Sequence, residues 1–328
     1  MAKRTAERTA GEFELITRHF TRSRRSAAVD LGVGDDCALL RVAPGMQLVV
    51  SSDMLVEGRH FLSTVAPDRL GHKALAVNLS DLAACGAEPL AFTLALALPR
   101  GDDHFAAGLA RGLFAQADLH GIELVGGDTT AGPLNICITA MGQVPVGQAL
   151  LRSGARPGDD LWVSGTLGDA RLALEVFRGT VVLDGQAFEQ VRRAMELPEP
   201  RVALGQALRG VASSAIDLSD GLLGDLGHVL QASCVGASVR VDSIPRSAVL
   251  ASQAPDLQHT CLLAGGDDYE LLFSAAPAQR QAVAAAAQGA GVAVTRIGAL
   301  TAARGLQVVD GHGAVLSQTW AGFDHFKS

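Results

Sequence analysis

Six short turns in this chain place aspartate beside glycine, serine or asparagine, and each of them follows an apolar run. A carboxylate beside a buried strand is costly unless it is paired or binds a cation. Lysine and arginine seldom fall near these turns, so a divalent cation is the natural partner. Oxygen ligands without accompanying His or Cys pairs favour Mg²⁺ or Ca²⁺ over zinc, and Mg²⁺ in proteins usually accompanies bound phosphate. The six turns are residues 34–36, 51–53, 78–81, 126–129, 217–220 and 265–268.

The segments between these turns alternate in character, because β-branched and aliphatic stretches are followed by stretches rich in Ala and Leu. This alternation is typical of a mixed α/β (α+β) fold. A chain of 328 residues exceeds what one core comfortably fills, so we expect two domains. The sequence predicts strands at 48–50, 91–98, 122–125, 135–144, 161–163, 215–218, 269–273 and 292–297, and helices at 70–84, 104–119, 170–177, 201–211, 222–232 and 277–289.

A polar segment that contains Pro and Gly, residues 152–160, separates two halves of similar style. We therefore place a domain boundary near residue 150, which gives domains 1–150 and 151–328. The tetrapeptide Val-Gly-Gly-Asp at 125–128 is echoed by Ala-Gly-Gly-Asp at 264–267, and this echo suggests two related domains.

Composition excludes several classes of partner. A formal net charge of −7, one Tyr and two Trp argue against a nucleic-acid surface, which needs basic stripes and stacking aromatics. The longest apolar stretch, 90–98, cannot span a bilayer, and the N-terminal ten residues lack the apolar core of a signal peptide or anchor. Five widely spaced cysteines without a C-x-x-C pair favour neither disulfides nor zinc, so we expect a reducing cytoplasm.

The common nucleotide-binding motifs are absent. Residues 32–37 approach the G-x-G-x-x-G fingerprint, but the last glycine is missing and carboxylates would face the pyrophosphate. Neither a P-loop nor the His-Arg-Asp set of protein kinases occurs. The segment 217–221 lacks the later glutamate of an EF-hand calcium loop. An ATP site in this chain would therefore be of another kind.

Each aspartate turn also has a purely local interpretation. Asp35 and Asp36 could form an Asx-turn, and the serines at 51–52 with Asp53 could cap a helix. Repetition of the pattern six times favours metal binding over capping. Asn78 and Asp81 lie three residues apart in a predicted helix and so share a face. Asp81 interrupts an apolar run, so we expect it to be buried, where capping cannot explain it.

Other candidate residues have two interpretations each. The glycines at 126–127 could form a plain turn or permit close approach of phosphate to the backbone. Arg152 could be a solvated linker residue or a two-pronged phosphate clamp. His60 could be structural or could contact a ligand. The terminal aromatics Trp320 and Phe323 could pack in a core or cover a heterocycle.

Taken in order, these residues resemble the thiamine-monophosphate kinase family. That family shares a superfamily with aminoimidazole ribonucleotide synthetase, selenophosphate synthetase and a hydrogenase maturation protein. The likeness covers nearly the whole chain, and so many motifs in one order are specific. They lie at residues 11–16, 34–40, 73–83, 126–130, 215–222 and 322–326.

The resemblance implies a homodimeric enzyme that moves the γ-phosphoryl group of ATP directly and in line onto thiamine monophosphate. Several Mg²⁺ ions would assist, and K⁺ is a further candidate cation. It also implies an N-terminal domain that pairs across a twofold axis into a β-barrel, a C-terminal α/β domain, and ATP in the cleft between domains. A phosphate oxygen is already an anionic nucleophile, so no general base is expected.

The resemblance also assigns residues to roles. The implied Mg²⁺ ligands are Asp36, Ser51, Ser52, Asp53, Asp81, Asp128, Asp217 and Asp220; the implied ATP contacts are Gly127, Asp128, Arg152 and Ser219; and the implied substrate contacts are His60, Asp267 and Phe323. Two positions depart from the commoner family residues. Asp267 stands where glutamate is usual, and Phe323 stands where tyrosine often occurs, so their contacts with the substrate differ in reach and in hydrogen bonding.

Alternative functions remain within and outside the superfamily. A selenophosphate synthetase would want a reactive Cys near its N-terminus, whereas the first cysteine here is Cys37. The maturation protein ends in a modified Cys, whereas this chain ends in Phe-Lys-Ser. An aminoimidazole ribonucleotide synthetase-like enzyme is a third relative. A non-catalytic divalent-cation-binding protein would explain the aspartate turns without turnover.

Overall fold

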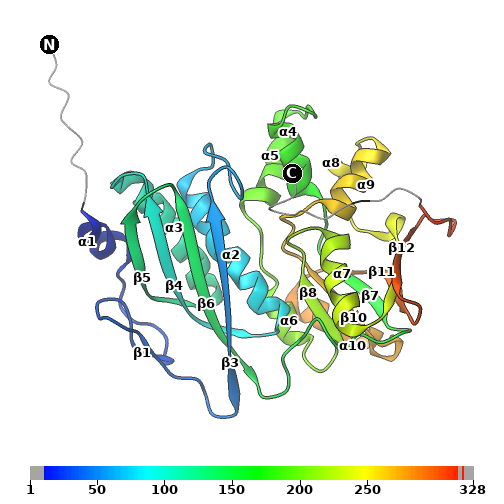
Figure 1. Ribbon diagram of the computed structural model, residues 1–328, viewed down its shortest axis with the longest axis horizontal. Coiled ribbons are helices and arrows are strands. Elements are labelled where there is room, and N and C mark those ends of the chain that lie inside the picture. Colours follow the sequence, from blue (N-terminus) through cyan, green and yellow to red (C-terminus); the bar gives the residue numbers. More distant parts are fainter. Residues whose placement is uncertain (1–10, 317–319, 321–328) are drawn as a thin grey trace. The chain divides into compact units, whose positions relative to one another are not determined.

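The computed structural model describes residues 11–316 and 320 of the chain. These residues form two compact units, one of residues 11–78 and 89–143 and the other of residues 79–88 and 144 onward. Figure 1 shows the elements of both units. The domain boundary expected near residue 150 stays a prediction, and the short segment 79–88 groups with the second unit.

The first unit is built on a four-stranded sheet with the strand order β3, β6, β4, β5. Strands β4 and β5 are parallel and α3 connects them, because a parallel pair needs a crossover rather than a tight turn. The side chain of Asp102 caps α3 by accepting a hydrogen bond from the N–H of Phe105 (3.0 Å). The elements are α1 (Glu12–Leu15), η1 (Ile16–Phe20), β1 (Val29–Leu31), β2 (Leu39–Leu40), β3 (Met46–Val56), α2 (Pro67–Ala84), β4 (Glu88–Leu98), α3 (Asp103–His120), β5 (Glu123–Ala131) and β6 (Asn135–Pro145).

This sheet buries one of its two faces. Successive side chains of a strand point to opposite faces, and along β6 Ile136 and Ile138 are buried while the residues between them are only half-buried. On the edge strand β3, Leu48, Val50 and Met54 are all about half exposed or more, and they occupy alternate positions on one face. The first unit therefore presents an apolar strand face that its own described residues do not cover.

The second unit is built on a six-stranded sheet with the order β12, β9, β11, β7, β10, β8. Only the β12–β9 pair is parallel. Its core is formed by fully buried side chains such as Val163, Leu272 and Ile297. The elements are β7 (Asp160–Ser164), α4 (Asp169–Phe177), α5 (Gly185–Glu196), α6 (Val202–Ala207), β8 (Ser214–Asp217), α7 (Leu222–Ser233), β9 (Gly236–Arg240), η2 (Val241–Ser243), α8 (Ala248–Ala251), α9 (Pro255–Ala264), β10 (Leu271–Ala275), η3 (Pro277–Gln279), α10 (Arg280–Ala290), β11 (Val294–Thr301) and β12 (Gly305–Val309).

Both units combine helices with a sheet, so the expected mixed α/β fold is confirmed. The two larger sheets are open, and neither closes into a barrel within the described residues. The strand expected at 48–50 is much longer, because β3 continues through residue 56. The sequence-based prediction missed several elements, namely α1, α5, α8, α9, β1, β2, β9 and β12. Of these, β9 and β12 are five-residue strands, too short to show a clear period.

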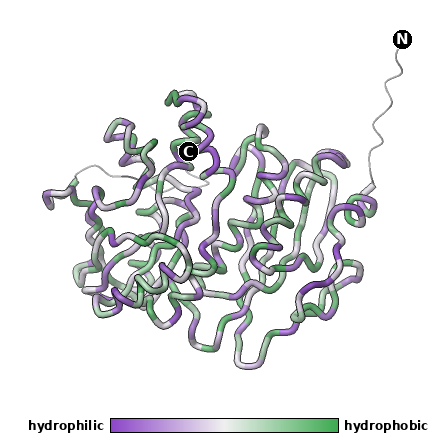
Figure 2. Tube along the Cα trace, turned by 180° about the vertical axis from the view of Figure 1, so that it is seen from behind, coloured by the Kyte–Doolittle hydropathy of each residue, from purple (hydrophilic) through white to green (hydrophobic). Residues whose placement is uncertain are grey.

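Polar residues interrupt the longer helices, as the hydropathy colouring in Figure 2 shows. Among the helices of the described residues, none is both long enough and apolar enough to cross a membrane.

The edge of the second unit's core contains a buried carboxylate with two arginine partners. Asp160 on β7 accepts hydrogen bonds from Arg280 (2.6 and 2.9 Å) and from Arg296 (3.1 Å). The Arg280 hydrogen bonds are the main cause that lowers the pKa of Asp160 below its usual value, although burial opposes them. Asp160 is 4% exposed, but both arginine side chains are more than a third exposed, so solvent screens these pairs.

We expect Asp160→Asn to lower the free energy of unfolding by about 1–2 kcal/mol at neutral pH. A lowered pKa in the folded state adds stability above the unfolded value, about 3.9, and that stability is lost as the pH falls through the folded pKa. The difference between wild type and variant should therefore be constant above about pH 5 and shrink below pH 4. Urea unfolding at pH 3, 4, 5 and 7 measures it. A difference that grows toward low pH would contradict this assignment.

Candidate functional site

The serine and aspartate turn at 51–53 lies inside β3, so it does not cap a helix. Strand alternation directs the side chains of Ser51 and Asp53 to one face and that of Ser52 to the other. The hydroxyl of Ser52 donates to the carbonyl of Ile138 (3.2 Å) and lies 3.0 Å from the hydroxyl of Thr139. The three side chains therefore cannot converge on one ion.

A buried asparagine fixes the backbone beside Asp53. The N–H of Asp53 donates to Oδ1 of Asn78 (3.2 Å), and Nδ2 of Asn78 donates to the carbonyl of Ala74 one turn earlier in α2 (3.0 Å). Asn78 is 1% exposed, so its amide has to be fully used. Asn78 thus joins helix α2 to strand β3 at the position of a predicted metal ligand.

Asp81 lies on α2 three residues after Asn78, as the sequence predicted. It is half-buried, however, so the expectation that Asp81 is buried is wrong. The helix ends at Ala84, and a carboxylate near that end keeps part of its solvation. Partial exposure also leaves the carboxylate accessible to a ligand.

His60 is held by two groups of the first unit. Its Nδ1 accepts a hydrogen bond from the N–H of Val56 (3.0 Å), which places the proton of the neutral imidazole on Nε2. The ammonium group of Lys73 donates to the carbonyl of His60 (3.3 Å). Lys73 is 2% exposed, which is rare for a lysine without a specific role. Sequence reasoning missed Lys73, and its position in the apolar face of α2 was the available signal.

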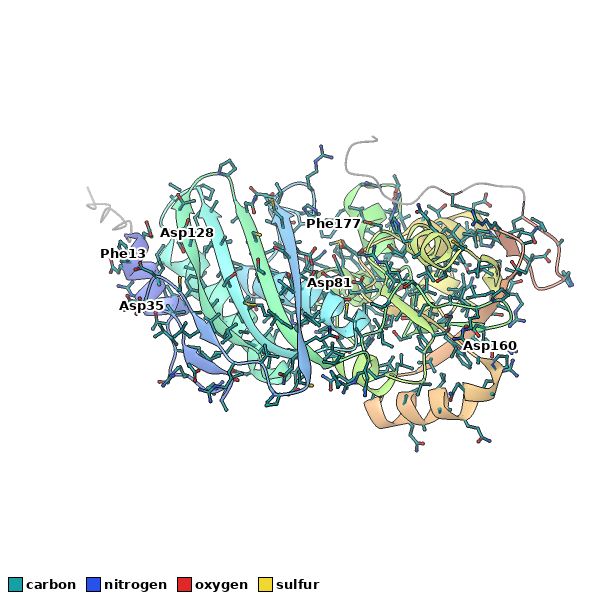
Figure 3. The ribbon with its side chains drawn as sticks, turned by 60° about the horizontal axis from the view of Figure 1, so that its bottom comes forward. Phe13, Asp35, Asp81, Asp128, Asp160 and Phe177 are labelled. Carbon is teal, nitrogen blue, oxygen red and sulfur yellow. The ribbon has the colours of Figure 1, made fainter. Side chains whose placement is uncertain are left out.

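Two further predicted aspartate turns fall in the first unit, and Figure 3 labels Asp35 and Asp128. The segment 126–129 lies inside β5, so the prediction of a turn there is wrong. The carboxylate of Asp35 accepts the N–H of the next residue, Asp36 (2.8 Å), which is a local contact but not the bond to the second residue on that defines an Asx-turn. Asp36 is exposed. Asp128 is exposed on β5 and follows Gly127, whose φ is 142°. The backbone of Gly127 lies so close to β4 that a Cβ there would be 1.8 Å from the carbonyl oxygen of Leu94.

In the second unit, the charges of three predicted site residues shift the pKa of the Cys85 thiol. Burial raises the pKa of the Cys85 thiol, the charges of Asp81 and Asp217 raise it further, and the charge of Arg152 lowers it. The hydroxyl of Ser80 donates to Oδ2 of Asp217 (2.8 Å), and both residues are buried. The predicted metal ligands Asp81 and Asp217 and the predicted phosphate clamp Arg152 therefore lie near enough to Cys85 for their charges to act on its thiol.

The turn that follows β8 is held by a carboxylate that sequence reasoning missed. Oδ2 of Asp225 on α7 accepts the N–H groups of Asp220 and Gly221, both at 3.1 Å. Burial, assisted by the charge of Asp220, raises the pKa of Asp225 to about 7. Asp225 therefore supports the turn that carries Ser219 and Asp220.

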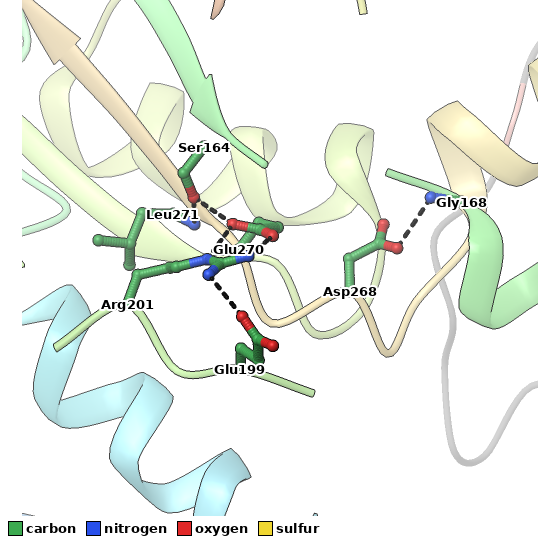
Figure 4. A network of polar contacts seen from close by, with 7 residues as sticks. All are labelled: Ser164, Gly168, Glu199, Arg201, Asp268, Glu270 and Leu271. Carbon is green, nitrogen blue, oxygen red and sulfur yellow. Dashed lines mark hydrogen bonds and ion pairs between the residues drawn. The ribbon is translucent and has the colours of Figure 1, made fainter. Parts of the chain in front are cut away.

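The turn at 265–270 is fixed by buried polar contacts, which Figure 4 shows. Glu270 accepts hydrogen bonds from Arg201 (2.7 and 2.5 Å) and from the hydroxyl of Ser164. Asp268 accepts the N–H of Gly168 (2.8 Å), and burial raises the pKa of Asp268 well above its usual value. These contacts hold the turn on both sides of Asp267.

The terminal aromatic residues and the expected metal site are the remaining predictions to compare with the structure. Phe323 lies outside the described residues, whereas Trp320 packs against the core of the second unit. Within residues 11–316 and 320, no three His, Cys, Asp or Glu side chains gather closely enough to hold a metal ion by themselves. Mg²⁺ needs fewer, because it is usually bound by one or two carboxylates together with water and phosphate oxygens.

Comparison with known families gives two adjacent matches. The N-terminal domain of AIR synthase related proteins matches residues 34–144, and the C-terminal domain of the same proteins matches residues 156–311. The thiamine-monophosphate kinase of Salmonella typhimurium is 45% identical over 323 residues, which are 97% of this chain and 99% of that protein. The thiamine-monophosphate kinase of Bacillus subtilis is 32% identical over 327 residues, which are 96% and 99% of the two chains.

Solved structures of similar proteins also match this chain over most of its length. The crystal structure of thiamine-monophosphate kinase from Stenotrophomonas maltophilia matches with a TM-score of 0.82 and 45% identity, over 92% of this chain and 95% of that chain. A structure of AaThiL complexed with AMPPCP and TMP matches with a TM-score of 0.75 and 27% identity, over 87% and 89% of the two chains. The hydrogenase maturation protein HypE in complex with ATP shares the fold at 20% identity, with a TM-score of 0.76 over 94% and 95% of the two chains.

Proposed function

Because the chain belongs to the thiamine-monophosphate kinase family, we propose that it transfers the γ-phosphoryl group of ATP to thiamine monophosphate and releases thiamine diphosphate and ADP. The observation that carries this proposal is the 45% identity to a kinase of that name over 97% of the chain. A related structure at 27% identity binds TMP together with AMPPCP, an ATP analogue that cannot be cleaved at its β–γ bridge.

The chemistry needs positioning and charge compensation more than proton transfer. An oxygen of the acceptor phosphate is anionic near neutral pH, so it attacks the γ-phosphorus without a general base. The barrier comes from repulsion between two polyanions, and groups that neutralise charge and align the reacting atoms lower it. The charge of Arg152 acts on the Cys85 thiol, as the charges of Asp81 and Asp217 do, and this supports Arg152 as the side chain that binds an ATP phosphate.

The donor atoms of the aspartate turns fit Mg²⁺. They are carboxylate and hydroxyl oxygens, which hard cations prefer, and the thiol of Cys85 beside them has a raised pKa and stays protonated. When bound, Mg²⁺ would supply the positive charge that brings the two phosphates together. We propose that several Mg²⁺ ions bind, with Ser52 contributing a backbone carbonyl because its side chain points away from Asp53. The proposed ligands of these ions are Asp36, Ser51, Ser52, Asp53, Asp81, Asp128, Asp217 and Asp220.

The proposed binding residues for ATP and for thiamine monophosphate come from both units. ATP is bound by Gly127, Asp128, Arg152 and Ser219, and the substrate is bound by His60, Asp267 and Phe323. The fixed tautomer of His60 supports its assignment as a substrate contact. The hydrogen bond of the neighbouring Asp268, which holds the turn, supports the assignment of Asp267.

A coupled ADP assay tests the proposed function. Purified protein with ATP and Mg²⁺ is given thiamine monophosphate, thiamine, an aminoimidazole precursor or selenide in separate reactions. We expect ADP only with thiamine monophosphate, and loss of that signal when EDTA removes the metal. Replacement of K⁺ by Na⁺ in the same assay tests a K⁺ requirement. ADP formed with another acceptor would indicate a different superfamily enzyme, and no ADP with any acceptor would favour a non-catalytic cation-binding protein.

We further propose that the protein is a homodimer that pairs through the uncovered face of the first unit's sheet and so completes a β-barrel. The support is the row of exposed apolar side chains on β3, of which Val50 is 55% exposed. We expect Val50→Glu to shift the molecular mass measured by light scattering from about twice that of the chain to that of the chain, because a buried unpaired carboxylate opposes association. Val182→Glu, at a 92% exposed position of the second unit, is the matched control. A wild-type monomer at all concentrations would contradict the proposal.

A further inference from the structure

The turn at 265–270 contains unusual backbone conformations. Among the described residues, three that are not glycine have a positive φ, and two of them, Asp267 (68°) and Tyr269 (50°), lie in this turn. Aspartate tolerates the left-handed region, whereas a bulky tyrosine rarely adopts it. Each such residue costs of order 1–2 kcal/mol, so the surrounding structure has to hold the turn in place.

Backbone hydrogen bonds and side-chain contacts hold this turn in place. The N–H groups of Asp267 and Tyr269 donate to the carbonyls of Ser219 (2.9 Å) and Leu218 (2.8 Å) in the turn after β8. Between and after them, the side chains of Asp268 and Glu270 are fixed by the contacts to Gly168, Arg201 and Ser164 described above. The backbone of this turn is therefore rigid on both sides of Asp267.

One contact directs the Asp267 side chain itself. The hydroxyl of Tyr269 donates to Oδ1 of Asp267 (3.0 Å). Tyr269 is only 9% exposed, so packing fixes its ring, whereas Asp267 is half-buried and retains access to solvent. The hydrogen bond from the phenol therefore helps to fix the orientation of the Asp267 carboxylate.

We propose that Tyr269 is a positioning residue that orients Asp267 toward the cationic, amine-bearing half of the substrate rather than toward its phosphate. This inference rests on the proposed function, because it takes thiamine monophosphate as the substrate. A carboxylate about 4 Å from a phosphate charge is repelled by roughly 4 kcal/mol at an effective dielectric of 20. The quaternary thiazolium nitrogen attracts the same carboxylate, and the pyrimidine amino group can donate a hydrogen bond to it.

Steady-state kinetics tests the role of the hydroxyl. Tyr269→Phe keeps the ring and removes only the donor, so we expect KM for thiamine monophosphate to rise about tenfold while kcat and KM for ATP change less than twofold. Asp267→Asn should raise the same KM, and the double variant should be little worse than Asp267→Asn alone, because the phenol acts through the carboxylate. Thr180→Val is the matched control, since it removes a hydroxyl that donates to the carboxylate of Glu175 (2.6 Å) outside this turn.

A truncated ligand separates the two halves of the substrate. Hydroxyethylthiazole phosphate keeps the phosphate but lacks both the pyrimidine and the quaternary nitrogen, so its inhibition constant should be the same for wild type and Tyr269→Phe. An inhibition constant that rises as much as KM for thiamine monophosphate would overturn the inference, because the pair would then serve the phosphate.

A spectroscopic signal tests the contact without turnover. Tyr269 is the only tyrosine among the 328 residues, so ¹³C at the phenol carbon gives one NMR resonance. We expect thiamine monophosphate to shift this resonance in the wild type, and Asp267→Asn to shift it without ligand. A resonance unmoved by saturating substrate, or an unchanged KM in active Tyr269→Phe, would overturn the inference. Absence of turnover in the wild type would instead overturn the proposed function.

Discussion

Replacing Asp217 with asparagine is expected to lower kcat by at least about 100-fold while the protein stays folded. Asp217 is 5% exposed, and the hydroxyl of Ser80 donates to its Oδ2 (2.8 Å). Asparagine has nearly the same shape and keeps an oxygen that can accept this hydrogen bond, so the packing around position 217 is preserved. In the working enzyme the negative charge of Asp217 would help to hold Mg²⁺ against the phosphates, and its loss removes transition-state stabilisation.

A large loss of kcat together with a retained fold makes the prediction specific. Coupled assays give kcat, and thermal unfolding without ligand gives stability. Asp184→Asn is the matched control, because Asp184 caps α5 by accepting the N–H of Ala187 (2.8 Å) and asparagine caps equally well. The control should change neither quantity appreciably. An Asp217→Asn enzyme with near-normal kcat, or one that unfolds readily, would show that Asp217 is a structural residue.

Replacing Gly127 with alanine is expected to lower the free energy of unfolding by about 3–5 kcal/mol. Gly127 pairs with Leu94 across the parallel strands β5 and β4, next to a register shift in that pair. An alanine Cβ would lie 1.8 Å from the carbonyl oxygen of Leu94, which is backbone and cannot move aside cheaply. The φ of 142° adds conformational strain for any residue with a Cβ.

The neighbouring glycine supplies the control. An alanine Cβ at Gly126 would meet no heavy atom of the described residues within 4 Å apart from its two chain neighbours, so Gly126→Ala should change stability by less than about 1 kcal/mol. Urea unfolding of the two variants beside wild type measures the difference. Equal effects would mean that the close approach of Gly127 to Leu94 does not determine stability. If Gly127→Ala folds, its KM for ATP should rise because Asp128 and the adjacent backbone are displaced.

Local patterns in the sequence were sufficient to predict many of the longer helices and strands. The long apolar helix at 70–84 and the strands at 91–98 and 135–144 were predicted within a few residues of α2, β4 and β6. The turn residues at 51–53 were placed at the end of a strand, whereas β3 continues through them. Nothing local distinguishes a strand that ends at two serines from one that continues, because cross-strand pairing with β6 decides it.

The supporting residues of the site were harder to predict, because their partners are distant in sequence. Ser80 and Asp217 are 137 positions apart, and Arg201 and Glu270 are 69 positions apart. Asp225 looked like an ordinary helix residue, yet it holds the preceding turn through two backbone hydrogen bonds. Tyr269 was assigned to a strand, but its positive φ and its bond to Asp267 place it in the turn before β10. The types of site residue follow from sequence, whereas their support depends on the fold.

Phosphorus NMR of the reaction tests the central claim most directly, because it observes where the transferred phosphoryl group goes. Wild-type protein with ATP, Mg²⁺ and thiamine monophosphate should convert the monoester resonance of the substrate into the two coupled resonances of thiamine diphosphate, in equal amount to the ADP formed. An unchanged monoester signal, with ATP intact or with its γ-phosphate released as inorganic phosphate, would contradict the account.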